Sequence, residues 1–201
     1  MTLTLKELYD SYYLVPLKGM NHPDVIYDPK QRKAPTVSIT KYANKKIPWS
    51  QFTTDRLGIQ TGYDGVEVID IDNHFGDAEQ IYNFICDHFD FENHPIVQTE
   101  SGGYHIYIKS DYCGGSVKLA MRSSHLLPNA DTSKPERGDA FIETRGKGGY
   151  VCAPPTAGYE LISGSFANIP ELSEEQRTFL FEFLRAQNEY IAGEGGTVNT
   201  Y

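Results

Sequence analysis

Two aspartates, Asp70 and Asp72, mark the carboxyl end of an apolar segment at residues 66–71. This segment is β-branched or apolar except for Glu67 and Asp70, which predicts a buried strand. Residues two apart in a strand point to one face, so we expect the two carboxylates to lie side by side. Such carboxylates repel each other and lose hydration, and bound Mg²⁺ or Mn²⁺ is the commonest compensation. The alternative is an exposed strand end where Asp72 begins a turn.

A third carboxylate, Glu143, follows two apolar residues in another short segment and repeats the pattern of the first aspartate. It is the natural third ligand of a two-metal site. Arg145 lies two residues further along the same face, and Lys147 lies in the turn beyond. One strand face thus carries an acidic side chain that could bind a metal ion and a basic side chain that could bind a phosphate. This combination favours a site for a metal-bound triphosphate. The alternative is an exposed Glu–Arg pair, which contributes little to stability.

A glycine-containing turn, Ser101-Gly102-Gly103, precedes an expected strand at residues 104–109. The paired glycines permit φ > 0 and leave backbone N–H groups uncovered, as close approach of a phosphate requires. His105 lies just past the turn and could donate a hydrogen bond to a phosphate oxygen. The alternative is an ordinary hairpin with a structural histidine.

The elements that must position these side chains are mostly strands flanked by helices, which indicates an α+β fold class. Capping-box spacing at Thr4 and Ser173 predicts helices from there to about residue 12 and about residue 192, and a third helix is expected at 77–89. Residues 110–139 lack periodicity and resemble an insertion. Residues 140–144 and 149–153 are expected to form a strand pair around a Gly-rich turn. The other expected strands are residues 13–17, 57–62, 95–99 and 159–163.

A long irregular segment at residues 18–49 contains four prolines and is the most basic part of the chain. Loops of this length are usually functional or disordered. Its basic side chains have two interpretations. They could contact phosphates, or they could simply be exposed to solvent on a surface loop. These cations are Lys30, Arg32, Lys33, Lys41, Lys45 and Lys46.

The composition limits the function classes. The chain has 201 residues, 18 basic against 27 acidic, and a net charge of −9. This argues against indiscriminate nucleic-acid binding, and it predicts that any DNA affinity is weak, sensitive to salt and helped by bound metal. The length suits one domain. The sequence contains no apolar run long enough to predict a membrane span, and no signal-peptide pattern follows Met1.

Three widely spaced cysteines argue against a disulfide framework and for a reducing cytoplasm. A zinc site is an alternative use of cysteine and histidine, although no pair shows the usual ligand spacing. Its candidate ligands are Cys86, His88, His94, Cys113 and His125.

Taken in order, these motifs resemble the primase–polymerase family of the archaeo-eukaryotic primase superfamily, which occurs in plasmid and phage replication proteins. Residues 33–35 (Lys-Ala-Pro) are similar to an early Lys-x-Pro element of the family. Residues 58–62 with 68–72 are similar to its first motif, residues 99–107 to its second, and residues 143–156 to its third. The four elements occur in the family's order and span most of the chain.

The resemblance implies that Asp70, Asp72 and Glu143 are the catalytic, metal-binding carboxylates and that His105 contacts the nucleotide phosphates. Relatives often have Asp where this chain has Glu143. The glutamate keeps the negative charge of an aspartate, and its side chain reaches one methylene further. The implied fold is archaeo-eukaryotic primase-like: a modified RNA-recognition-like antiparallel sheet with flanking helices and a small N-terminal α/β unit. We therefore expect a single catalytic domain at residues 1–193, with an N-terminal part (1–65), a catalytic sheet (66–165) and a C-terminal helix (173–192). Residues 194–201 are expected to be a flexible tail.

The implied function is that of a DNA primase/DNA-directed polymerase, a nucleotidyltransferase that starts or extends primers on single-stranded DNA. Two Mg²⁺ or Mn²⁺ ions about 3.5–4 Å apart would be its cofactors, and an NTP or dNTP its substrate. No helicase module follows in the sequence, so we expect that a replicative helicase would be supplied as a separate protein. The expected location is the cytoplasm, and no membrane is expected as a partner. The expected nucleotide-binding residues are Ser101, Gly102, Gly103, His105, Arg145, Lys147 and Lys33. The expected template contacts, with aromatic stacking on bases, are Lys41, Tyr42, Lys45, Lys46 and Trp49.

Two other classes of function stay open. A metal-dependent nuclease or phosphohydrolase uses similar acidic clusters. A non-catalytic replication module would bind nucleotide or a helicase without turnover, and the negative net charge favours it.

Overall fold

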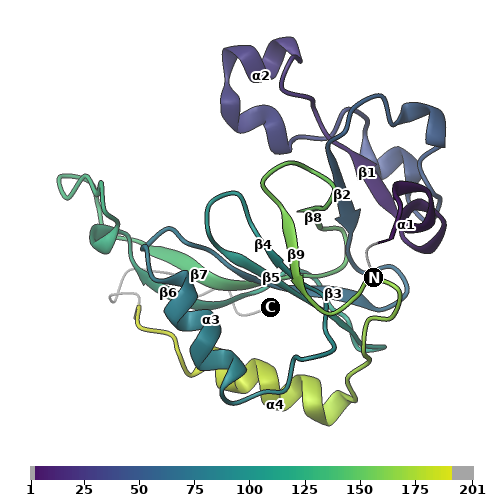
Figure 1. The fold of residues 1–201 in the computed structure, drawn as a ribbon. Helices are drawn as coiled ribbons and strands as arrows, with labels where there is room; N and C mark the ends of the chain where they lie inside the picture. Colours follow the sequence, from purple (N-terminus) through teal and green to yellow (C-terminus); the bar gives the residue numbers. More distant parts are fainter. Residues whose placement is uncertain (1–2, 192–201) are drawn as a thin grey trace.

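The computed structural model describes residues 3–191 and has an α+β fold built on two antiparallel sheets (Figure 1). The larger sheet has the strand order β6-β7-β3-β5-β4-β9, and the smaller has the order β1-β2-β8. The larger sheet comprises β3 (Val66–Ile71), β4 (Ile96–Gln98), β5 (Tyr104–Lys109), β6 (Lys118–Ser123), β7 (Gly138–Arg145) and β9 (Glu160–Ser163). The smaller comprises β1 (Leu14–Pro16), β2 (Leu57–Gln60) and β8 (Tyr150–Ala153). The predicted α+β class with antiparallel strands is confirmed.

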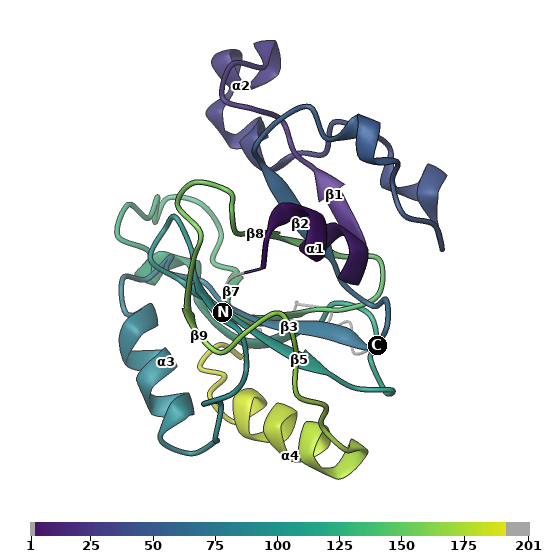
Figure 2. The same cartoon turned by 45° about the vertical axis from the view of Figure 1, so that its right-hand side comes forward.

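The described residues also form four α-helices: α1 (Leu5–Ser11), α2 (Pro23–Tyr27), α3 (Ala78–Cys86) and α4 (Glu174–Arg185). Helices α3 and α4 cover one face of the larger sheet, while the smaller sheet and α1 lie over the other (Figures 1 and 2). Short 3-10 helices occupy the basic segment and one later loop: η1 (Pro29–Lys33), η2 (Ile39–Tyr42), η3 (Trp49–Gln51) and η4 (Ser124–Leu126). The irregular segment expected at 18–49 is thus a series of short helical turns.

Strand β3 lies inside the larger sheet and is buried along its whole length. Its alternating side chains separate two hydrophobic cores. Val66 and Val68 pack in the core between the two sheets, whereas Ile69 and Ile71 pack in the core beneath α3 and α4. The alternation therefore places Asp70 on the face of Val66 and Val68, and Glu67 on the face of Ile69 and Ile71.

Glu67, fully buried on the helix-facing side of β3, is held by an ion pair with α4. Its two carboxylate oxygens accept hydrogen bonds from Arg177 Nε and Nη2 at 2.7 and 3.0 Å. A bidentate guanidinium–carboxylate pair of this kind fixes both charges in a single geometry. The pair fastens the C-terminal helix to the central strand.

Helix α4 begins as predicted, because Ser173 and Gln176 form the expected capping box. The expectation that it runs to residue 192 is wrong, since the helix ends at Arg185. The chain then turns back onto edge strand β6, where the Met121 N–H donates to the Asn188 side chain at 2.8 Å and the Met121 carbonyl accepts from two backbone N–H groups. These bonds replace those of a longer helix. The tail expected at 194–201 lies outside the described residues.

Residues 110–139, where no strand was expected, contain β6, which pairs with β7. The pairing register shifts between Lys118 and Ala120 and again between Ala120 and Met121. Such bulges break the strict alternation of exposed and buried residues by which a strand is recognised in sequence.

The expectation of a strand pair around residues 145–148 is also wrong. Strand β7 pairs with β3 and β6, whereas β8 pairs with β2 in the smaller sheet. Between them the chain crosses from one sheet to the other, held by a hydrogen bond from the Thr61 hydroxyl to the Gly146 carbonyl at 2.6 Å. A Cβ on Gly146 would lie 2.2 Å from the Gly114 carbonyl oxygen, so only glycine fits this crossing.

Within the described range, no helix combines the length and apolar character needed to cross a bilayer. The three cysteines are unpaired.

Candidate active site

The register of the larger sheet brings the three sequence motifs together at one point. Asp70 on β3 is paired with His105 on β5 on one side and with Glu143 on β7 on the other. Directly paired residues on neighbouring strands point to the same face of a sheet, with Cβ atoms about 4.5–5.5 Å apart. The predicted convergence of residues from distant parts of the chain is therefore present.

Asp72 completes a cluster of carboxylates with Asp70 and Glu143. One oxygen from each residue lies within 4.8 Å of the others. Over residues 3–191, this is the one group of three or more His, Cys, Asp or Glu side chains close enough to share a metal ion. The zinc ligands considered above form no such group in that range.

The electrostatics of the cluster favour binding of a cation. Burial raises the pKa of Asp72, and the neighbouring Asp70 raises it further. Burial likewise raises the pKa of Glu143, against the pull of Arg145 and with the push of the aspartates. Three carboxylates in one partly buried site offer only hard oxygen donors, so they fit Mg²⁺ or Mn²⁺.

Arg145 is the cation nearest to this cluster. Its Nε donates a hydrogen bond to Asp70 Oδ2 at 3.1 Å, and its Nη2 contacts Glu143. Because the guanidinium is shared by two carboxylates and half-buried, it differs from the exposed Glu–Arg pair that was the alternative.

His105 is buried beside the cluster, with Nε2 3.5 Å from Asp70 Oδ1. Burial lowers the pKa of His105, and Lys33 and Arg145 lower it further, although Asp70 acts in the opposite direction. The imidazole is therefore neutral at pH 7 and carries one N–H to donate.

A cavity of about 290 Å³ opens next to these residues. It joins the carboxylate Asp70 and His105 to two cations, Arg145 and Lys33. Tyr150 donates a hydrogen bond to the Lys33 carbonyl at 2.8 Å, which fixes the end of η1 at the rim. The rest of the lining is residues 148–152 and Tyr159. The cavity thus brings one carboxylate of the cluster, Asp70, together with two cations.

The turn at Ser101-Gly102-Gly103 lies beside the loop that carries Asp72. Asn73 Nδ2 donates to the Ser101 carbonyl at 3.0 Å, and a Cβ on Gly103 would lie 2.3 Å from the Ile71 carbonyl oxygen. Gly102 has a φ of +80°. Close packing on the end of β3 therefore accounts for the glycine pair, and the turn is not part of the cavity lining.

The remaining predicted contacts are dispersed. Lys147 lies outside the cavity, with its backbone N–H bonded to the Gly114 carbonyl. Lys46 Nζ donates to the carbonyl of Tyr9 at 2.8 Å, at the C-terminus of α1, and Trp49 packs edge-on against the same tyrosine. Tyr42 packs against the core between the sheets, and Lys41 and Lys45 are exposed.

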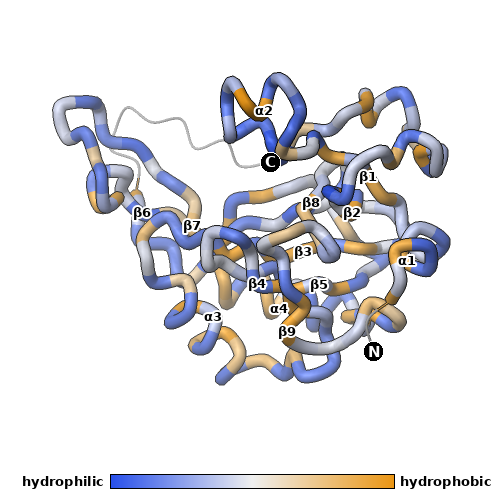
Figure 3. Tube along the Cα trace, turned by 45° about the horizontal axis from the view of Figure 1, so that its top comes forward, coloured by the Kyte–Doolittle hydropathy of each residue, from blue (hydrophilic) through white to orange (hydrophobic). Residues whose placement is uncertain are grey.

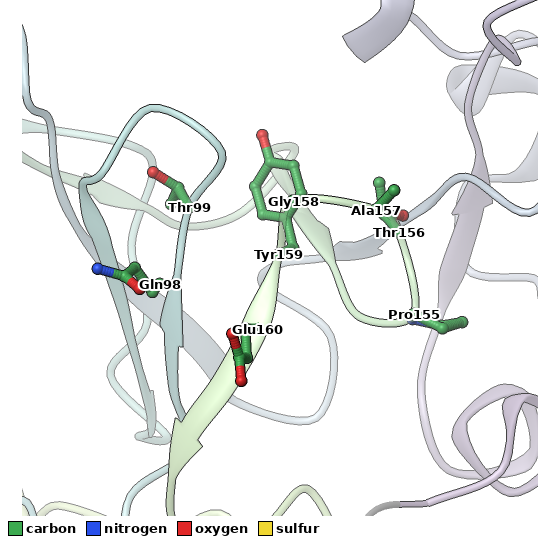
Figure 4. A pocket seen from close by; sticks show the side chains of 8 residues that line it. All are labelled: Gln98, Thr99, Pro155, Thr156, Ala157, Gly158, Tyr159 and Glu160. Carbon is green, nitrogen blue, oxygen red and sulfur yellow. The ribbon is translucent and has the colours of Figure 1, made fainter.

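Six residues of the cavity lining, those at 148–152 and Tyr159, were not among the expected site residues. The first five fall inside the third motif, and that position was the available signal. Tyr159 carried no functional signal, because the sequence indicated only that it begins an expected strand at residues 159–163. Its ring lies 6.0 Å from that of His105, and it also lines a second cavity of about 240 Å³ between β4 and the segment 155–160 (Figure 4).

Fold and site together define an α+β domain with a candidate centre for a divalent metal ion and an adjoining cationic cavity. The chain belongs to the family of bifunctional DNA primase/polymerases, whose N-terminal domain model (Prim-Pol) matches residues 7–175. The resemblance in the sequence motifs is thereby confirmed. A comparison with curated proteins found no match. Family membership indicates a nucleotidyltransferase of the primase/polymerase type, with DNA and nucleotides as its substrates.

Proposed function

We propose that this protein is a metal-dependent DNA primase/polymerase that synthesises or extends primers on single-stranded DNA in plasmid- or phage-type replication. The observation that carries the proposal is the cluster of Asp70, Asp72 and Glu143 beside a cationic cavity, in a chain of this family. A cytoplasmic location and a separately supplied replicative helicase belong to the same proposal. Three unpaired cysteines are consistent with the cytoplasm.

The three carboxylates would hold Mg²⁺ or Mn²⁺. A cation bound there would lower the pKa of a primer 3′-hydroxyl and neutralise charge on the phosphates. The protein has little covalent work in this chemistry, so positioning and charge neutralisation carry the rate.

Binding of the triphosphate falls to Arg145, Lys33 and His105. The two cations line the same cavity as Asp70, and the neutral imidazole offers an N–H donor without a second positive charge. The Ser101–Gly103 turn would act mainly by positioning Asp72, because it is tied to the following loop through Asn73. Lys147 would need a side-chain movement to reach the phosphates.

We assign the larger sheet as the modified RNA-recognition-like sheet of the family and residues 1–193 as a single catalytic domain. The two cores lie on opposite faces of β3, and this strand contributes side chains to both. The N-terminal part and the catalytic sheet therefore share one central strand. This shared strand supports one unit rather than two.

The test is incorporation of labelled dNTP or NTP on a primed template, and on unprimed single-stranded DNA, with each metal. We expect incorporation that requires Mg²⁺ or Mn²⁺ and that Asp70→Ala and Asp72→Ala abolish while retaining the fold. Shortening of the labelled strand would instead identify a nuclease. Metal-dependent nucleotide binding without turnover would identify a non-catalytic module. Either result, or wild-type incorporation by an aspartate variant, would overturn the proposal.

A further inference from the structure

A group of large apolar side chains lies exposed on and beside α2. Tyr27 is 94% exposed, Ile26 71% and Met20 57%. They belong to a unit, residues 18–33, that projects beyond the smaller sheet, and hydrophobic positions stand out in its otherwise hydrophilic trace (Figures 1 and 3). We call Met20, Ile26 and Tyr27 the α2 ledge. Three large exposed apolar side chains within residues 20–27 make this unit a candidate interaction site.

The ledge stands on a fixed support. Val25, on the other side of α2, is buried, and Lys18 Nζ lies 2.6 Å from Asp24 Oδ2. At the other end of the unit, Arg32 Nε donates to Glu100 Oε2 at 2.9 Å, which joins η1 to the turn of the second motif. The exposed side chains are therefore held in place relative to the larger sheet.

The same unit reaches the candidate active site. Lys33, the last residue of η1, lines the cavity beside Asp70. Tyr27 and Lys33 are six positions apart in the chain, so their Cα atoms lie within about 20 Å. At about 3.4 Å per phosphate along one strand of DNA, this distance corresponds to at most about six nucleotides.

The charge of the unit is opposite to that of the chain. Residues 18–33 contain four cations against Asp24 and Asp28, whereas the whole chain carries −9. Lys30, the nearest of these cations to Tyr27 in sequence, is exposed. The four cations are Lys18, Lys30, Arg32 and Lys33. Proteins bind single-stranded DNA by combining exposed aromatic rings with cations that follow the backbone, and this cationic segment carries an exposed tyrosine.

We propose that the α2 ledge binds the single-stranded template, with one base stacked on the Tyr27 ring and the backbone near Lys30. The inference rests on the proposed function and deepens it, because it names the surface that presents the template to the cavity. It moves the stacking contact from Trp49, which packs on Tyr9 of α1, to Tyr27. Stacking tolerates any base, so we expect little sequence preference.

The experiment compares Tyr27→Ala with Tyr27→Phe. Both alter a side chain that is almost wholly exposed, so melting temperatures should stay within about 2 °C of the wild type. Tyr112→Ala is the matched control, because Tyr112 is 52% exposed in a loop on another part of the chain. Binding of a labelled oligothymidylate is measured by fluorescence anisotropy with Mg²⁺ at low salt.

We expect Tyr27→Ala to weaken DNA binding about 5- to 100-fold, the range that corresponds to the loss of one stacked base. Tyr27→Phe and Tyr112→Ala should bind within twofold of the wild type. The Michaelis constant for the nucleotide at saturating template should be unchanged in all three. A double variant with Lys30→Gln should weaken binding further and reduce its salt dependence.

Wild-type DNA affinity in Tyr27→Ala would overturn the inference. So would a change of oligomeric state in that variant at unchanged DNA affinity, since the ledge would then be a contact between copies of the chain. A wild-type protein that binds no DNA overturns it as well. A wild type that binds DNA through Tyr27 but incorporates no nucleotide would refute the proposed polymerase activity and leave this surface standing.

Discussion

Replacing Asp72 by Asn should have opposite effects on stability with and without metal. Without metal, the variant removes one of three carboxylates that lie within 4.8 Å of one another. Two unit charges at that distance, with an effective dielectric constant of 20, repel by about 3.5 kcal/mol. Asp72 has two such neighbours, which gives a gross repulsion of about 7 kcal/mol.

Part of this repulsion is offset, because Asp72 is also attracted by His74, Arg145 and Lys33. The raised pKa of Asp72 shows that burial and repulsion outweigh the attraction. We therefore expect Asp72→Asn to stabilise the metal-free protein by about 1–3 kcal/mol, the part of the repulsion that these cations leave uncompensated. For a chain of this size, that corresponds to a rise of roughly 3–8 °C in melting temperature.

With metal, the order should reverse. At 100 times its dissociation constant, a ligand stabilises the folded state by about 2.7 kcal/mol, and the wild type should gain this while the variant gains little. The assay is thermal unfolding in EDTA and across a MnCl₂ titration, with Asp111→Asn as a control at an exposed acid. Equal metal-induced shifts in Asp72→Asn and wild type would refute the reasoning, as would a lower melting temperature of the variant in EDTA.

Three further predictions concern the scaffold. Arg177→Met leaves the buried Glu67 carboxylate without its partner and should cost about 3–5 kcal/mol in urea unfolding, most of it recovered when Glu67→Leu is added. Gly103→Ala places a Cβ 2.3 Å from a backbone oxygen and should cost about 1–3 kcal/mol, whereas Gly114→Ala, which meets open space, should change stability by less than about 0.5 kcal/mol. Burial lowers the pKa of His94, so below about pH 6.5 the unfolded chain binds a proton that the folded protein excludes. The free energy of unfolding should therefore decrease as the pH is lowered, by up to about 1.4 kcal/mol per pH unit, and the decrease should be less steep in His94→Gln.

The central strand was predictable because both its faces are buried. A segment at 66–71 that is β-branched except for Glu67 and Asp70 predicts a buried strand. The alternation within it assigns Asp70 to one face. What the pattern alone does not contain is the register. That Asp70 pairs with both His105 and Glu143 depends on hydrogen bonding between segments far apart in the chain, and only the ordered resemblance to a family indicated it.

The errors have local physical causes. Strand β6 was missed because two bulges break its alternation. Strands β7 and β8 were paired because four residues containing glycine are typical of a hairpin turn, whereas here the glycine serves a close crossing between sheets. The end of α4 was placed too late because its true end depends on bonds to Met121, far away in sequence.

The prominence of the ledge could not be read from the sequence either. The segment 22–27 contains a good helix start, with Pro23 at the first turn. The helix itself has only five residues, which is too short for an amphipathic period that would assign its faces. Which of Val25, Ile26 and Tyr27 is buried is decided by packing of the unit on its neighbours. The structure buries Val25 and exposes the other two.

The most direct test of the account is the position of bound metal. Crystals soaked in MnCl₂ with a non-hydrolysable nucleoside triphosphate would locate manganese by its anomalous scattering. We predict manganese peaks bonded to oxygens of Asp70, Asp72 and Glu143, with triphosphate oxygens bound by Arg145 and His105. Manganese bound elsewhere, or a triphosphate bound away from this cavity, would contradict the account.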